Sequence, residues 1–211
     1  MSDNHKLYEL ALNDRDLLPV IATGPAGTGK TFGAAGAAVK WLQDRRKKVV
    51  VTRPNVSFAK ELGFIPGTER EKLGPWIKPI EQNFMFHGMK RGELESKENN
   101  GQLTYIALEH IQGLTFDDTF LIVDEAENMS FDQMRVLLTR TGKYSKVVLC
   151  GDVAQTSPKF RNSGLAELVS MIMELDVPAH VIRFDVDDIK RSEQCKQWIM
   201  SFDAWTDRGA A

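Results

Sequence analysis

Cysteine is scarce in this sequence, and a long apolar run is absent. Cys150 and Cys195 are the only cysteines among 211 residues. Two cysteines are too few for a disulfide framework or a cysteine-based metal site, and they are typical of a reducing compartment. No stretch reaches the roughly 20 apolar residues that a membrane helix needs, and the polar start, Met1 to Glu9, does not resemble a secretory signal. We therefore expect a cytoplasmic protein without a membrane partner.

The chain also lacks a strong excess of charge of either sign. Lysine and arginine together number 27, against 29 aspartate and glutamate residues, for a net charge of −2. A strongly basic nucleic-acid-binding domain is thereby excluded, although a local basic patch is compatible with this balance. With 42% hydrophobic and 27% charged residues, the composition is that of an ordinary globular protein rather than a disordered or collagen-like one. The length suits a single domain, expected to cover residues 1–211.

Short apolar runs alternate with helix-like patterns along most of the chain. Strands are predicted at 17–22, 49–52, 103–108, 120–123, 147–150 and 181–184. Helices are predicted at 31–43, after the capping pair Ser130 and Gln133, at 165–172 and at 195–202. Short continuous strands separated by helices are typical of a parallel sheet that is covered on both faces. We therefore predict an α/β fold with five or six parallel strands.

One predicted strand ends in a glycine-rich string that opens the next helix. The string, GPAGTGKT, fits the phosphate-loop pattern G-x-x-x-x-G-K-[ST] throughout, and its candidate nucleotide-binding residues are Gly24, Pro25, Ala26, Gly27, Thr28, Gly29, Lys30 and Thr31. Glycines let the backbone curl so that several N–H groups and the helix N-terminus point at one anion. Lys30 is expected to reach the β- and γ-phosphates, and the Thr31 hydroxyl to ligate Mg²⁺. The alternative, an accidental glycine-rich turn, does not account for the strand before the loop and the helix after it.

The apolar run 120–123 ends in two carboxylates, Asp124 and Glu125. In a phosphate-loop protein, an aspartate at such a strand end holds Mg²⁺ directly or through water. Glu125 is then placed to orient and deprotonate a water molecule, which makes hydrolysis the expected reaction. The alternative is a solvated loop with helix-capping acids, because Ser130 begins a helix shortly afterwards.

A second strand end carries polar residues. The buried run 147–150 leads into a glycine turn that is followed by Asp152 and Gln155. In this class of sheet such a strand lies between the strands that handle phosphate. Gln155 is then expected near the γ-phosphate, where it would report hydrolysis to the rest of the protein. Asp152 on its own could equally be an ordinary turn residue.

Together these strings resemble the PhoH family, phosphate-starvation-inducible ATPases related to superfamily 1 RNA helicases. The likeness rests on GPAGTGKT, TRPNVSFAKELGFIPGT, EKLGPWIKPI, DEAEN and GDVAQ, of which the second and third are specific to the family. The resemblance implies a single RecA-like P-loop NTPase domain with strand order 5-1-4-3-2. It also implies ATP and Mg²⁺ as cofactors, and ATP hydrolysis that some members couple to unwinding or remodelling RNA.

The resemblance also assigns roles to residues outside these strand ends. Arg53 and Asn55 correspond to the segment that contacts nucleic acid in helicases, with a surface salt bridge as the alternative for Arg53. His5 and Tyr8 correspond to a motif in which glutamine reads adenine, so they are implied to bind the nucleotide. This chain departs from the family in having His5 in place of that glutamine and Glu127 where the family has the glutamine of DEAQN. The family string RGRT is replaced by QGLT at 112–115, which removes two positive charges.

An additional cation is expected at the γ-phosphate, and Arg191 is the first candidate for such an arginine finger. Arg191 is favoured by family likeness and by its position at the start of the predicted C-terminal helix. The alternative is a salt bridge at the helix end to Asp187 or Asp188. Arg140 and Arg161 are weaker candidates for the finger. Superfamily 1 helicases place ATP between two RecA-like domains, whereas this chain has room for one. The resemblance therefore implies a homo-oligomer, a hexameric ring, in which a neighbouring copy supplies the arginine. The polar segment 88–101 is expected to be a surface loop or a frayed helix, with a pore-facing loop as a further alternative.

Three functions compete at this stage. The first is an ATPase with helicase-like action on RNA or single-stranded DNA, for which nucleic acid should stimulate turnover. The second is an assembly module in which ATP sets subunit contacts and hydrolysis is slow; the low net charge and the missing arginines favour it. The third is a phosphotransferase, against which Glu125 and the lack of a recognisable acceptor site both argue.

Overall fold

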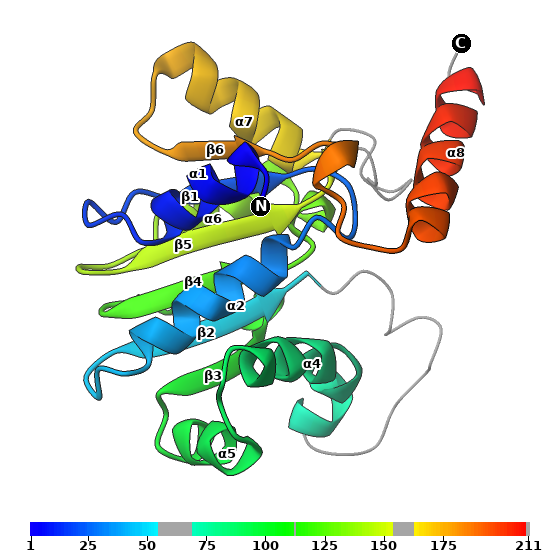
Figure 1. Ribbon diagram of the computed structural model, residues 1–211. Coiled ribbons are helices and arrows are strands. Elements are labelled where there is room, and N and C mark those ends of the chain that lie inside the picture. Colours follow the sequence, from blue (N-terminus) through cyan, green and yellow to red (C-terminus); the bar gives the residue numbers. More distant parts are fainter. Residues whose placement is uncertain (55–68, 112, 154–162, 210–211) are drawn as a thin grey trace.

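The computed structural model describes the chain except residues 55–68, 112, 154–162 and 210–211. Within the described residues, the centre is a six-stranded sheet in the order β3-β2-β4-β5-β1-β6, with parallel neighbours throughout (Figure 1). The strands are β1 (Val20–Thr23), β2 (Lys48–Arg53), β3 (Leu103–Ala107), β4 (Thr119–Val123), β5 (Lys146–Gly151) and β6 (His180–Arg183). Every residue of β1, β4 and β5 is buried, as expected for strands whose two faces are both covered.

The strand order differs in one detail from the expected order 5-1-4-3-2. Five strands, β6-β1-β5-β4-β2, follow that order when they are numbered by themselves along the chain. β3 is an additional edge strand that lies outside β2, with Tyr105 opposite Val51. The described part of the segment between β2 and β3 contains helices that allow the chain to cross over and return parallel to β2.

Helices cover both faces of the sheet, as predicted. One layer holds α1 (Asp3–Leu12), α2 (Lys30–Trp41), α4 (Glu69–Phe86) and α5 (Arg91–Asn99), and the other holds α6 (Phe131–Leu138) and α7 (Gly164–Leu175). Successive strand residues point to opposite layers, so that Ile122 packs with the first set of helices and Leu121 with the second. Short 3₁₀ helices are η1 (Leu108–Ile111), η2 (Ala126–Asn128) and η4 (Val186–Asp188).

Two local predictions have different outcomes. Ser130 and Gln133 form the predicted capping box at the start of α6. For the segment 88–101, a loop is the wrong expectation and a helix the right one, because residues 91–99 form α5. Its glutamate and lysine residues are good helix formers, and the buried Leu94 anchors it against the core. A pore-facing role for this segment stays a prediction.

The C-terminal helix α8 (Glu193–Gly209) extends beside the body of the molecule rather than across the sheet (Figure 1). Its aromatic side chains are largely exposed: Trp198 by 60%, Phe202 by 65% and Trp205 by 74%. Trp198 and Phe202 stack on each other, with ring centroids 5.8 Å apart. No helix in the described part of the chain is long and apolar enough to cross a membrane.

Candidate functional site

A cavity of about 510 Å³ lies at the carboxyl ends of β1, β4 and β5. This is the edge of a parallel sheet at which ligands bind in open α/β folds. The cavity collects residues from five separate segments: Ala26, Gly27, Gly29, Lys30, Thr31 and Phe32; Asn83; Asp124, Glu125 and Glu127; Cys150, Gly151 and Asp152; Lys190 and Arg191. The phosphate loop and the two polar strand ends therefore meet in one place, as the sequence predicted.

The phosphate loop owes its shape to glycines with positive φ. Gly27 and Gly29 have φ values of 84° and 86°, and Gly24 one of 137°, a region that residues with a Cβ rarely adopt. Gly29 immediately precedes α2, and no side chain among the described residues caps the helix there. The first N–H groups of α2 are thus left to bind an anion together with the helix dipole.

Lys30 is folded back over the loop. Its Nζ donates hydrogen bonds to the carbonyl oxygens of Gly24, at 2.6 Å, and Pro25, at 2.8 Å. Burial lowers the pKa of Lys30 from its usual value, while the nearby carboxylates of Asp152, Glu127 and Asp124 counteract this shift. The ammonium group therefore occupies the position at which a phosphate oxygen can replace the loop carbonyls.

Thr31 and Asp124 are suited to bind a divalent cation. The Thr31 hydroxyl donates to Asp124 Oδ1 over 2.6 Å, so two oxygen ligands already converge between α2 and β4. No cluster of three or more histidine, cysteine, aspartate or glutamate side chains that could hold a metal ion occurs in the described part of the chain. One carboxylate and one hydroxyl fit Mg²⁺, which keeps most of its water shell and takes its other ligands from substrate phosphates.

Glu125 follows Asp124 in a left-handed conformation, with φ of 50°. Such values are unfavourable for residues other than glycine and occur often at functional sites. Burial raises the pKa of Glu125 above its usual value, and the guanidinium of Arg53 opposes that shift. Glu125 is thus a more basic carboxylate than one in water, as a base that accepts a proton from water requires.

Arg53 lies at the acidic pair. Its guanidinium forms an ion pair with Glu125 and also lies 3.8 Å from Asp124 Oδ2. Arg53, which was predicted to contact nucleic acid, therefore touches Glu125, which was predicted to accept a proton from water. The two meet because β2 and β4 are neighbours and Thr52 stands opposite Val123. Asn55, the other residue predicted to contact nucleic acid, lies outside the described residues.

Glu127 connects the ends of β4 and β5. Its Oε2 accepts a hydrogen bond from the backbone N–H of Asp152 over 3.1 Å, and burial raises the pKa of Glu127 to about 7. A Cβ at Gly151 would lie 2.8 Å from the same oxygen, so glycine is needed for this approach. Glu127 is thus held at the end of β5, where it lines the cavity. Gln155, predicted to lie near the γ-phosphate, is outside the described residues.

Arg191 lies on the phosphate loop of its own chain. A Cβ at Gly27 would be 2.9 Å from Arg191 Cγ, and the backbone N–H of Lys190 donates to Gly27 O over 2.9 Å. One expectation is corrected: α8 begins at Glu193, so Arg191 precedes the helix. Arg191 lines the cavity of its own chain, and an arginine supplied by a neighbouring copy stays a prediction. The two carboxylates considered as salt-bridge partners of Arg191 have other partners: Asp187 pairs with Lys196, and Asp188 accepts a hydrogen bond from Asn4. Of the weaker candidates, Arg140 lies elsewhere, near Leu114, and Arg161 is outside the described residues.

The residues predicted to bind the nucleotide from α1 support the loop from behind. Tyr8 is 2% exposed and donates from its hydroxyl to the Lys30 carbonyl over 2.8 Å. The Tyr8 hydroxyl also lies 3.6 Å from Cys150 Sγ, at the wall of the cavity, and direct contact between Tyr8 and a nucleotide stays a prediction. His5 contacts the loop through Thr28 O, at 2.9 Å.

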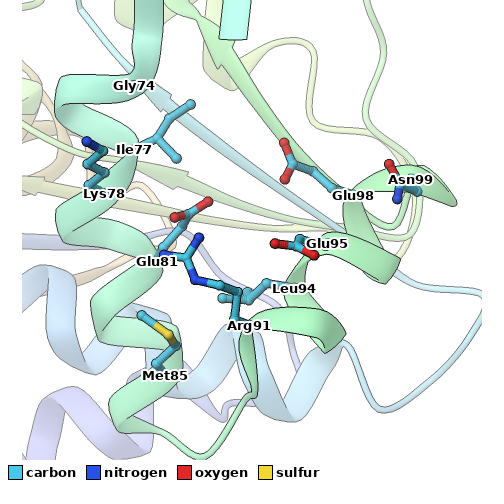
Figure 2. Close-up of a pocket in the computed structure, with 10 residues that line it drawn as sticks. All are labelled: Gly74, Ile77, Lys78, Glu81, Met85, Arg91, Leu94, Glu95, Glu98 and Asn99. Atoms are coloured by element: carbon cyan, nitrogen blue, oxygen red, sulfur yellow. The ribbon is translucent and has the colours of Figure 1, made fainter. Parts of the chain in front are cut away.

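A second cavity, of about 480 Å³, lies between α4 and α5 (Figure 2). Its apolar floor contains Ile77, Met85 and Leu94, and charged side chains of both signs surround it, among them Lys78, Glu81, Arg91, Glu95 and Glu98. None of the residues predicted from the sequence to bind the nucleotide or the metal lines this cavity. The residues suited to nucleotide and metal binding therefore lie at the cavity of the phosphate loop.

Comparison with known proteins agrees with this geometry. A family model described as "PhoH-like protein" matches residues 1–203. The chain belongs to the PhoH-like protein family. It is 41% identical over 169 residues to Protein PhoH2 of Bacillus subtilis, covering 76% of this chain and 38% of that protein. It is 38% identical to a PhoH-like protein of Mycobacterium leprae, covering 82% and 49%, and 30% identical to Protein PhoH of Escherichia coli, covering 92% and 55%.

The chain thus spans about half the length of the PhoH-like relatives that it matches. Among solved structures, it is similar to the large terminase of a thermophilic bacteriophage in complex with ADP. The TM-score is 0.56 with 14% identity, and the match covers 93% of this chain and 48% of the terminase. At this identity the likeness shows a shared α/β fold.

Four residues of this PhoH-like cavity were not predicted: Phe32, Asn83, Cys150 and Lys190. Phe32 directly follows the loop, and Lys190 directly precedes Arg191, so adjacency was a usable signal for both. Asn83 enters from α4, which packs on α2, and no local pattern indicates that contact. The pairing of Arg53 with Glu125 could have been inferred, because the expected strand order already placed these two strand ends side by side.

Proposed function

We propose that this PhoH-like chain is an ATPase that hydrolyses ATP with Mg²⁺ and couples hydrolysis to movement on, or remodelling of, RNA or single-stranded DNA. One observation supports it above the others. An uncapped phosphate loop with Lys30 and Thr31 faces Asp124 and Glu125 across a single cavity. Anion binding, metal binding and activation of water are thereby brought within one site.

Each side chain has a distinct task in this proposal. Thr31 and Asp124 hold Mg²⁺, which when bound offsets the negative charge of the β- and γ-phosphates. Lys30 exchanges the carbonyls of Gly24 and Pro25 for phosphate oxygens. Glu125 orients a water molecule and accepts its proton, and its burial favours that role because the pKa of Glu125 is raised.

The γ-phosphate receives further support from two sides. Arg191, which lies on Gly27, is proposed to neutralise charge there within its own chain. Gln155 is proposed to contact the same phosphate from the end of β5 and to report its loss. Both roles would place a donor where negative charge develops during phosphoryl transfer.

Arg53 offers a physical route from nucleic acid to hydrolysis. While it pairs with Glu125, its positive charge opposes proton transfer to that carboxylate. A polynucleotide whose phosphate draws away Arg53 would leave Glu125 free to act on water. Asn55 is proposed to contact the same strand, two residues further along the chain.

The test is the rate of phosphate release from Mg-ATP, with and without single-stranded RNA or DNA. Lys30→Ala should lose turnover, whereas the matched control Lys40→Ala, an exposed position on the same helix, should keep it. RNA or DNA should raise the wild-type rate several-fold. Arg53→Ala, which removes the partner of Glu125 permanently, should raise the rate without nucleic acid toward the stimulated rate and abolish further stimulation. A wild-type rate that no polynucleotide changes would count against the coupling.

A nucleotide-dependent assembly module with slow hydrolysis is the second candidate, and α8 favours it. Its exposed Trp198 and Phe202 form an apolar face suited to a subunit contact. This candidate predicts a larger particle in Mg-ATP than without nucleotide, including a hexameric ring, and little effect of RNA on turnover. Molecular mass measured by light scattering in both conditions, alongside the rate assay, separates the two functions.

A further inference from the structure

The nucleoside end of the candidate site is bounded by the N-terminus of α1 and by residues 185–191. Lys30, Thr31 and Asp124 mark where the β- and γ-phosphates and the metal would lie. The α-phosphate and its nucleoside must then extend away from Asp124, along the first half of the loop. There His5 contacts Thr28 O, and Lys190 contacts Gly27 O, each over 2.9 Å.

Both ring nitrogens of His5 are engaged within the chain. Nε2 lies 2.9 Å from Thr28 O, and because a carbonyl can only accept, this nitrogen carries a proton. Nδ1 lies 2.6 Å from Ser2 Oγ and 3.7 Å from Asp188 Oδ1. In a neutral ring Nδ1 accepts the Ser2 hydroxyl proton, and in a protonated ring it faces the Asp188 carboxylate. In both forms each ring nitrogen has a partner within the chain, so a base edge would have to displace Thr28 O or the Ser2 hydroxyl.

Among the described residues of this corner, Asn4, Asp185 and Asp188 are joined in the same way. Asn4 donates from Nδ2 to Asp188 Oδ2 over 2.7 Å, and the backbone N–H of Asp185 donates to the same oxygen over 2.9 Å. Asp188 is 3% exposed, and the His5 ring also packs against Phe184, with centroids 5.1 Å apart. The start of α1 is thus a clamp that ties the phosphate loop to η4.

The cations beside this clamp do not distinguish one base from another. Lys190 and Arg191 are exposed and line the cavity. They can contact phosphates by charge, and an arginine plane can stack on the face of any base. Adenine and guanine differ at their edges, where one offers an amino donor and the other a carbonyl acceptor. A site rejects the wrong base strongly only when it hydrogen-bonds that edge.

We propose that the site binds nucleoside triphosphates through their phosphates without reading the base, and that His5 is a positioning residue which clamps the phosphate loop. The inference rests on the proposed function insofar as the ligand is a nucleoside triphosphate. It differs from the expectation that His5, in the place of an adenine-reading glutamine, contacts the base.

The experiment is equilibrium binding of non-hydrolysable ATP, GTP, CTP and UTP analogues with Mg²⁺ to the full chain, measured by calorimetry. The four dissociation constants should agree within about threefold. An ATP analogue that binds more than about tenfold tighter than the GTP analogue would overturn this inference and leave the proposed function standing. If no triphosphate binds, both are overturned.

A His5→Ala variant separates a clamp from a base reader. A clamp predicts that all four analogues weaken together, by about three- to tenfold, the effect of one lost hydrogen bond, so that their ratios are unchanged. A base reader predicts a selective loss for ATP. Asn4→Ala, which cuts the other link to Asp188, should reproduce the uniform loss, and Lys6→Ala, an exposed position on the same helix, should have no effect. Thermal unfolding of each variant verifies that the chain is folded.

Discussion

Lys146 is a side chain whose burial the candidate site does not explain. It starts β5 opposite Phe120, is 0% exposed, and its Nζ has no hydrogen-bond partner among the described residues. Burial lowers the pKa of Lys146 below its usual value, and the carboxylate of Asp14 opposes this only in part. A charged or polar group buried in this way without a partner destabilises the folded state.

We therefore expect Lys146→Met to stabilise the protein, by about 1–3 kcal/mol at neutral pH. Because the folded-state pKa lies below the unfolded value, the folded chain releases this proton first as the pH rises. In the wild type, the destabilisation caused by burying charged Lys146 is complete below the folded-state pKa. It shrinks as the pH rises from there toward 10.5, the usual pKa of lysine. Denaturant unfolding at several pH values should thus show that the stability gained by Lys146→Met over the wild type becomes smaller at alkaline pH. The control is Lys143→Met, at an exposed position. If it stabilised the protein as much as Lys146→Met does, burial of an unpaired charge would not be the cause.

Among the residues of the site, those that lie in short contiguous motifs could be predicted from the sequence. The loop from Gly24 to Thr31 and the pair Asp124 and Glu125 carry their chemistry in local strings, and the structure brings them together. The orientation of Arg191 toward its own loop could not be predicted, since it depends on the path of residues 185–191 across the sheet edge. The same is true of Asn83, whose position depends on how α4 packs.

The packing of α4 against α2 connects the phosphate loop to the helical layer over β2 and β3. His87, just after α4, donates from Nε2 to the Phe32 carbonyl over 2.9 Å. Its ring lies against Gly36, where an added Cβ would be 2.7 Å from Cε1 of His87. The absence of a side chain at Gly36 therefore allows α4 to approach the first turns of α2.

Gly36→Ala should consequently have opposite effects in two backgrounds. In the wild type, the clash with a ring held by a hydrogen bond should lower the stability by about 1 kcal/mol. In a His87→Ala background, the same change should raise the stability by about 0.5–1 kcal/mol, because alanine favours a helix over glycine. Thermal unfolding of the four proteins measures this.

The control is Gly92→Ala in α5, where nothing lies within 4 Å of the added Cβ. It should stabilise both backgrounds by similar amounts. If Gly36→Ala were stabilising in both backgrounds as well, the close packing described for α4 and α2 would be contradicted.

Elements with a strong local pattern could be predicted, and those formed by tertiary packing could not. The strands are short runs of β-branched and other apolar residues, and this pattern is sufficient to identify them. Helix α4 contains Pro75 and Pro79, which oppose a helix by local rules, yet its buried Ile77, Ile80 and Phe84 hold it against the core. The edge position of β3 follows from the long crossover through α4 and α5, which no short window of sequence contains.

For the molecule as a whole, the topology gathers the candidate chemistry at one edge of the sheet. β1, β4 and β5 are adjacent and parallel, so their carboxyl ends supply the loop, the acidic pair and Asp152 side by side. The chain adds Arg191 itself, and the face of α8 remains available for a partner. Arg191 thus reaches the cavity within one chain, and a homo-oligomer stays a prediction of the second candidate function.

The most direct test of the account is phosphate release by Glu125→Gln in Mg-ATP, measured together with its affinity for ATP. The variant keeps the shape of the side chain but cannot accept a proton from water. It should bind ATP within about threefold of the wild type and turn over at least about 100-fold more slowly, whereas Glu109→Gln, an exposed control, should match the wild type in both. Hydrolysis by Glu125→Gln at the wild-type rate would contradict the assignment of Glu125 as the base, and with it the proposed mechanism.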